Sequence, residues 1–151
     1  MKKAFSVILS LFLILTGLSV AAAEITLPIE QAELPNIVPA ESMEDFVGAW
    51  ELCGFSDIIA TVLDKDNYAV AAMQTTLDIT EQEAVMHVTT LGDAVLQCKF
   101  NAEDGTLLIT SGEGDNGMVY YLYDNGMIAY TSNSMGRDMT LFFSRVEEPQ
   151  E

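Results

Sequence analysis

Short stretches in which apolar and polar residues alternate fill most of the chain after residue 45. The clearest is residues 73–80, where Met73, Thr75, Leu77 and Ile79 alternate with more polar residues, the pattern of a strand with one buried face. Turn-forming residues separate these stretches, and Asn125-Gly126 suits the positive φ angles of a tight hairpin turn. The pattern predicts eight strands, over residues 46–55, 73–80, 83–90, 94–100, 106–111, 117–123, 127–132 and 138–146.

The connections between these strands are short, so neighbouring strands must run antiparallel in an up-and-down meander. An open sheet would leave two unpaired edges, and pairing of the first strand with the last removes both. A short helix is expected between the first two strands, because apolar residues between 58 and 63 recur at helical spacing after Ser56-Asp57, which could cap it. The predicted fold is all-β, an eight-stranded antiparallel barrel with one short helix.

The two ends of the chain differ in composition from this barrel segment. Residues 1–23 carry two lysines near the start, then an apolar stretch, then three alanines, which is typical of a cleaved secretory signal peptide. The apolar stretch from Phe5 to Val20 is shorter than the roughly 20 residues that a spanning helix needs. Residues 24–45 contain three prolines among acidic residues and predict an extended arm. The barrel is expected over 46–147, with a polar tail at 148–151.

The charge of the chain limits its partners. Cleavage after Ala23 removes Lys2 and Lys3, which leaves four of the six basic residues against all 23 acidic ones, a net charge of −19. Such a surface repels phosphate backbones and anionic lipids, so we expect neither nucleic acid nor membrane as a partner after cleavage. Solubility outside the cell, or a docking surface for a basic partner, explains the charge. The expected location is extracellular or in the cell envelope.

Gly48-Ala49-Trp50 on the first predicted strand and Arg145 on the last resemble the lipocalin-like (calycin) barrels. In that superfamily the tryptophan packs under the arginine at the closed end, so the resemblance implies that Gly48, Trp50 and Arg145 close this barrel. An arginine over an indole face gains cation–π energy. Residues 47–52 and 139–145 also resemble small lipocalin-like domains secreted by gut bacteria, over a region of residues 46–147. The chain is shorter than full-length lipocalins, which implies a shallower cup.

Cys53 and Cys98 form an even pair in a chain with an export signal, and a disulfide between them is one expectation. By strict alternation, however, Cys53 faces away from Trp50, whereas Cys98 shares a face with Phe100. The two side chains meet only if a bulge, for which Gly54 is a candidate, shifts the alternation. A disulfide and two separate thiols are therefore both open.

The residues typical of catalytic and metal sites are sparse. His87 is the single histidine of the chain. Its neighbours on the same strand face, Val85 and Thr89, do not complete a Ser-His-Asp or Cys-His catalytic arrangement, so we expect an ordinary strand histidine. One histidine and two separated cysteines do not suggest a zinc site. Residues 64–67 lack the glycine and distal glutamate of a helix–loop–helix calcium site. Residues 112–117, in which two acidic residues lie among glycines, are expected to form a solvated turn, with weak cation binding as the alternative. We expect no metal, no cofactor and no enzymatic activity.

An eight-stranded barrel is either filled by its own side chains or just wide enough for one small ligand. Five methionines, whose thioethers adapt to irregular shapes, and one leucine are the candidate lining of such a site: Met73, Leu77, Met86, Met118, Met127 and Met139. Ordinary core packing is the alternative role of these residues. The expected function is that of a secreted, non-enzymatic, lipocalin-like module that binds a small apolar ligand. The alternative is an exported protein-interaction or protease-inhibitor barrel that acts through its N-terminal arm or its surface.

Overall fold

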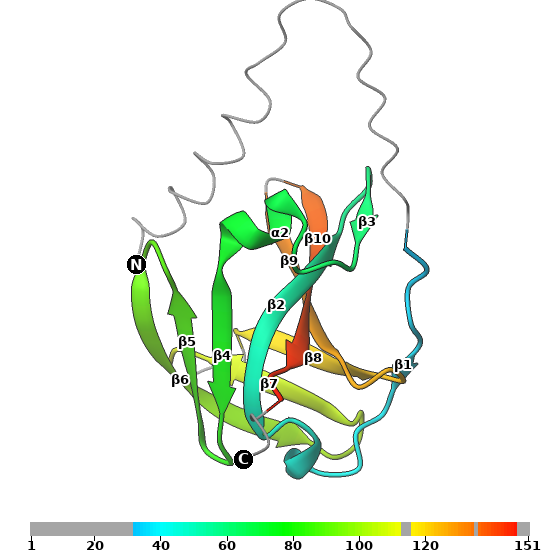
Figure 1. Cartoon of the computed structure of the whole chain (residues 1–151). Helices are drawn as coiled ribbons and strands as arrows, with labels where there is room; N and C mark the ends of the chain where they lie inside the picture. The colour runs from blue at the N-terminus through cyan, green and yellow to red at the C-terminus, as the bar shows by residue number, and fades with distance from the viewer. Residues whose placement is uncertain (1–31, 113–115, 135, 148–151) are drawn as a thin grey trace, which may run out of the picture.

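A single antiparallel sheet dominates the computed structural model, which describes residues 32–112, 116–134 and 136–147 (Figure 1). Between the strands lie a 3-10 helix, η1 (Met43–Asp45), and one α-helix, α2 (Tyr68–Met73). The strands are β1 (Ile37–Val38), β2 (Gly48–Ser56), β3 (Thr61–Val62), β4 (Thr75–Ile79), β5 (Glu83–Val88), β6 (Gly92–Asn101), β7 (Thr106–Thr110), β8 (Met118–Tyr123), β9 (Ile128–Ser134) and β10 (Arg137–Arg145).

The sheet closes into a barrel of eight strands, β2 and β4 to β10. Each strand pairs antiparallel with the next along the chain, from β4 to β10, and β2 pairs with both β4 and β10. The seam between β2 and β10 runs from Ser56 opposite Thr140 to Trp50 opposite Arg145. The predicted closed, up-and-down, eight-stranded barrel is therefore confirmed.

A short helix does lie between the first two barrel strands, but not at residues 58–63, where the sequence pattern placed it. Those residues instead turn back along β2 and form β3, because the Asp57 carboxylate accepts hydrogen bonds from the amides of Ile59 and Ala60 and closes a tight turn. The helix follows as α2, where the side chain of Asn67 caps the first turn by accepting from the Ala69 amide at 3.0 Å. The same residue types that cap a helix can also close a turn, and this led to the misplacement.

Strand β2 contains a bulge at Cys53. Phe143 lies opposite Leu52 and Phe142 lies opposite Gly54, so Cys53 has no partner of its own on β10. Leu52 faces the core before the bulge and Phe55 packs against the core after it, which strict alternation would not allow. A side chain at Gly54 would collide with the backbone of β3, so glycine allows the close approach of that strand.

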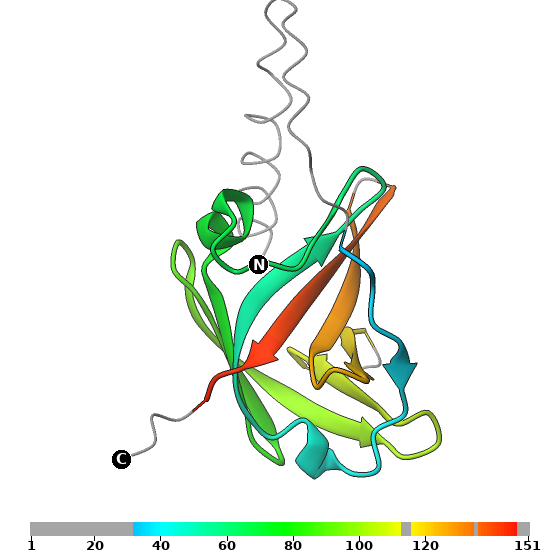
Figure 2. The ribbon, with the colours of Figure 1, turned by 45° about the vertical axis from the view of Figure 1, so that its right-hand side comes forward.

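The described part of the expected arm, residues 32–45, lies against the barrel. β1 pairs with the end of β8, the Asn36 side chain donates to the Asp124 carboxylate at 2.9 Å, and the Ala40 amide donates to the Gly105 carbonyl at 3.1 Å. Figure 2 shows this segment as the blue strand and loop along the side of the barrel. The predicted signal peptide, residues 24–31 of the arm and the tail at 148–151 lie outside the described residues. Among the residues that are described, no helix has the length and apolar character to cross a membrane.

Candidate functional site

The seam between β2 and β10 ends in a contact between Arg145 and Trp50. The guanidinium carbon lies 4.4 Å from the centroid of the indole ring. The same guanidinium donates to the carbonyl oxygens of Asp45, at 2.9 Å, and of Val47. Gly48 has a φ of +138°, and a Cβ there would collide with the Arg145 guanidinium. The structure thus brings together Gly48, Trp50 and Arg145 at the closed end of the barrel.

Side chains occupy the closed end and the middle of the barrel. Trp50 is 1% exposed, and its indole N–H donates to the Phe46 carbonyl at 2.8 Å. Farther in, the Tyr120 ring lies 6.1 Å from the Phe143 ring and 5.0 Å from the Tyr130 ring, measured between centroids. The other inward-facing side chains of this region have almost no exposed surface: Phe46, Leu77, Ile79, Ala84, Leu107 and Ile128. This part of the barrel is therefore a packed core.

The inward-facing side chains toward the other end, where α2 lies in Figure 1, are less buried. Phe55, Leu141 and Tyr130 lie side by side across β2, β10 and β9, and all three are only half-buried. Ala94 on β6, directly opposite Met86 on β5, is exposed. Solvent therefore reaches an apolar part of the interior at this end.

The six candidate ligand-binding residues divide between these environments. Leu77 is part of the packed core. Three methionines are half-buried and pack against that core: Met73, Met86 and Met118. Met139 is also half-buried, and it lies two residues before inward-facing Leu141 in β10, on the same face of the strand. Met127 lies apart, on the outer side of the wall, because the next residue, Ile128, is the one that faces the core. Alternation puts Met127 and Ile128 on opposite faces, but it does not say which of the two faces inward, because both residues are apolar.

Cys53 and Cys98 are both free thiols. Cys53 belongs to a small cluster on the outer side of the wall with Phe142, whereas Cys98 packs against the interior core. The bulge that could have brought the two sulfurs to one face does exist, but it turns Phe55 inward and leaves Cys53 outside. Burial raises the pKa of both thiols, that of Cys98 to about 11, so both are protonated at neutral pH.

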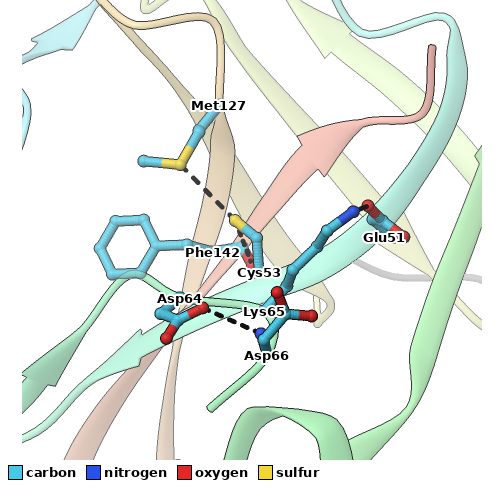
Figure 3. Close-up of polar contacts among 7 residues, drawn as sticks. All are labelled: Glu51, Cys53, Asp64, Lys65, Asp66, Met127 and Phe142. Atoms are coloured by element: carbon cyan, nitrogen blue, oxygen red, sulfur yellow. Dashed lines mark hydrogen bonds and ion pairs between the residues drawn. The ribbon is translucent and has the colours of Figure 1, made fainter.

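An open groove of about 550 Å³ lies beside α2, between this helix, the loop before it and the strands β2, β4, β5 and β6, and both inward-facing Leu52 and outward-facing Glu51 line it. At one side of it the Lys65 ammonium pairs with the Glu51 carboxylate at 2.8 Å, as Figure 3 shows. This hydrogen bond raises the pKa of Lys65. Among the described residues, no group of three or more histidine, cysteine, aspartate or glutamate side chains is placed to hold a metal ion.

His87 lies at the other side of the groove between two carboxylates. Its Nδ1 is 2.7 Å from Asp93 Oδ1 and its Nε2 is 3.3 Å from Asp78 Oδ2. The hydrogen bond to Asp93 is the main cause of a raised pKa for His87, against a smaller opposing effect of desolvation. The sequence pattern missed this cluster because it placed Asp93 in the turn. Strand β6 in fact begins at Gly92, whose φ is +84°, and His87 pairs with Asp93. The glycine at the end of the turn is the sequence signal that could have indicated this register.

These features define a class: a small all-β barrel of eight antiparallel strands, closed by an arginine over a tryptophan, with a packed core at one end. No protein-family model matches the chain, and neither a curated protein nor a solved structure matches it.

Proposed function

We propose that this chain is a secreted, lipocalin-like, non-enzymatic module that binds one small apolar ligand at the α2 end of its barrel. The observation that supports this proposal is the difference in burial along the interior. Inward-facing side chains at the closed end are fully buried, whereas apolar ones toward α2, such as Phe55, Met118 and Leu141, are half-buried. A ligand at the α2 end would cover apolar surface that water now contacts, at about 25 cal/mol per Å².

The lining favours an uncharged ligand, and its flexible side chains can adapt to the shape of that ligand. Met73, Met86, Met118 and Met139 contribute flexible thioethers that follow irregular apolar surfaces. Tyr130 adds one polar group, and burial raises the pKa of its phenol, so it stays protonated and can donate a hydrogen bond. The closed end is packed, so the site is a shallow cup and the ligand is small.

The alternative is a protein-interaction or protease-inhibitor barrel that acts through its N-terminal arm, residues 24–45, or through its surface. Action through the arm would require the arm to be presented to a partner, and the structure describes it from residue 32 onward. Pairing of β1 with β8 and the hydrogen bonds between Asn36 and Asp124 instead hold this part of the arm on the barrel. The cup is therefore the better-supported site.

The proposal is tested with a fluorescent apolar probe titrated into the full-length protein, together with mass spectrometry of solvent extracts of the natively purified protein. Met118→Gln and Met139→Gln each place an amide in the cup, and we expect each to weaken probe binding by about tenfold, or ~1.4 kcal/mol. Met127→Gln is the matched control, because Met127 lies on the outer side of the wall, and it should leave the affinity unchanged. Equal affinities for all three variants, together with extracts that contain only solvent and buffer, would refute the proposal.

A further inference from the structure

Two sulfur atoms lie side by side on the outer side of the barrel wall, away from the cup. Cys53 Sγ is 3.6 Å from Met127 Sδ, as Figure 3 shows, and 3.4 Å from the carbonyl oxygen of Phe142. The β2 bulge places the thiol outside, and the turn at Asn125-Gly126 brings the thioether next to it. These two sulfurs come from segments 74 residues apart in the sequence.

We propose that Cys53 and Met127 form a binding site for one monovalent soft metal ion, with copper(I) and silver(I) as its chemical class. Thiolate and thioether are the side-chain ligands that select soft ions. Metal–sulfur bonds of about 2.3 Å allow two sulfurs on one ion to lie up to ~4.6 Å apart. The observed 3.6 Å falls inside this limit, so the ion would sit to one side of the line between the sulfurs, in a bent arrangement.

The surroundings of the pair favour a single positive charge. Cys53 is 8% exposed and packs with Phe142 and Ala129, and Leu63 covers the same cluster. A thiolate with a monovalent ion is neutral and tolerates an apolar environment, whereas a divalent ion would leave a buried positive charge. Zinc also needs about four ligands in a closed site, and this pair supplies two.

Binding exchanges the S–H bond of Cys53 for a bond between sulfur and the metal ion, and no oxidation state changes. The S–H bond of Cys53 breaks, the proton leaves to solvent, and the S–metal bond forms while the ion stays monovalent. The hydrogen bond from the thiol to the Phe142 carbonyl is lost in the exchange. Because one proton is released on binding, affinity should rise with pH.

The test uses the full-length protein, kept reduced without added thiols and without oxygen. Copper(I) is offered from a coloured competing chelator and silver(I) in a parallel titration, with stoichiometry read by native mass spectrometry. We expect one ion per chain in the wild type and in Cys98→Ala, the matched control with its thiol on the interior side. Cys53→Ala should bind none, and Met127→Leu, which keeps the size but removes the sulfur, should bind more than about tenfold more weakly.

Three results would overturn the site. Wild-type affinity in Met127→Leu would mean that the Cys53 thiol binds the ion without the thioether. Loss of the ion in Cys98→Ala would place the site at Cys98, in the barrel interior. Equal binding of zinc(II) would show that the site does not prefer a monovalent ion. Circular dichroism checks that each variant folds, and Cys53→Ser replaces Cys53→Ala if the alanine variant does not. Protection of Cys53 from alkylation by the bound ion gives a second readout that needs no variant.

Discussion

Replacement of Arg145 by alanine tests the contact at the end of the seam between β2 and β10. The substitution removes a guanidinium 4.4 Å from the Trp50 ring centroid and its hydrogen bonds to the carbonyls of Asp45 and Val47. The cation–π contact contributes about 0.5–1 kcal/mol at an exposed site. Each hydrogen bond from a charged donor adds about 1.5 kcal/mol at the low end, and we halve this value because Arg145 is exposed. The expected loss in the free energy of unfolding is ~2 kcal/mol.

The assay is urea unfolding followed by tryptophan fluorescence, since Trp50 is the single tryptophan of the chain. The midpoint should fall while the denaturant slope stays constant, because the surface exposed on unfolding hardly changes. Arg145→Lys should lose an intermediate amount, because it keeps the charge but not the planar fork of donors. Arg137→Ala, an exposed position at the start of the same strand, makes the same change in net charge and should cost less than ~0.5 kcal/mol.

A loss of unfolding free energy in Arg145→Ala that is no larger than the loss in Arg137→Ala would contradict this expectation. In that case the loss would come from the net charge of an acidic chain, and the seam would be stable without the guanidinium. The comparison between the two arginines separates these causes, because both substitutions remove one positive charge from β10.

Two further predictions concern backbone strain and titration. Gly48→Ala should destabilise the fold by about 1–3 kcal/mol, because φ is +138° and the new Cβ meets the Arg145 guanidinium; urea unfolding measures this, and a loss below ~0.5 kcal/mol contradicts it. His87, whose ring signals are unambiguous in NMR because the chain has one histidine, should titrate above the ordinary value of about 6.5, and Asp93→Asn should lower its pKa more than Asp78→Asn. Since the folded-state pKa is raised, the contribution of His87 to stability is present below about pH 6.5 and is lost as pH rises through the folded pKa; an unchanged or lowered His87 pKa contradicts this.

The strand order and the closure of the barrel could be predicted from the sequence because the pattern that specifies them is local. Period-two alternation marks each strand, and short turns leave little choice in how neighbours pair. The helix was misplaced because apolar residues at helical spacing need not be buried: Ile58 and Ile59 are 76% and 64% exposed at the turn before β3. Spacing alone does not say whether a tertiary surface exists for these residues to cover.

The candidate sites were harder to predict because they depend on register. A shift of the turn between β5 and β6 was enough to hide the contact between His87 and Asp93, since residues on paired strands meet only when the register is right. The docking of the arm depends on contacts between residues far apart in the chain, such as Asn36 with Asp124. The composition of this segment, rich in proline and acidic residues, predicted an extended arm but not where the arm would lie.

The bulge in β2 connects the two proposed sites. Without the additional residue, Phe55 would point out of the barrel and the cup would lose part of its apolar wall. With it, Cys53 and Gly54 both face Phe142 on the outer side, where the thiol meets Met127 and the missing side chain of Gly54 admits β3. One irregular residue in a strand therefore shapes both faces of the wall, which agrees with the tendency of bulges to re-aim side chains next to sites.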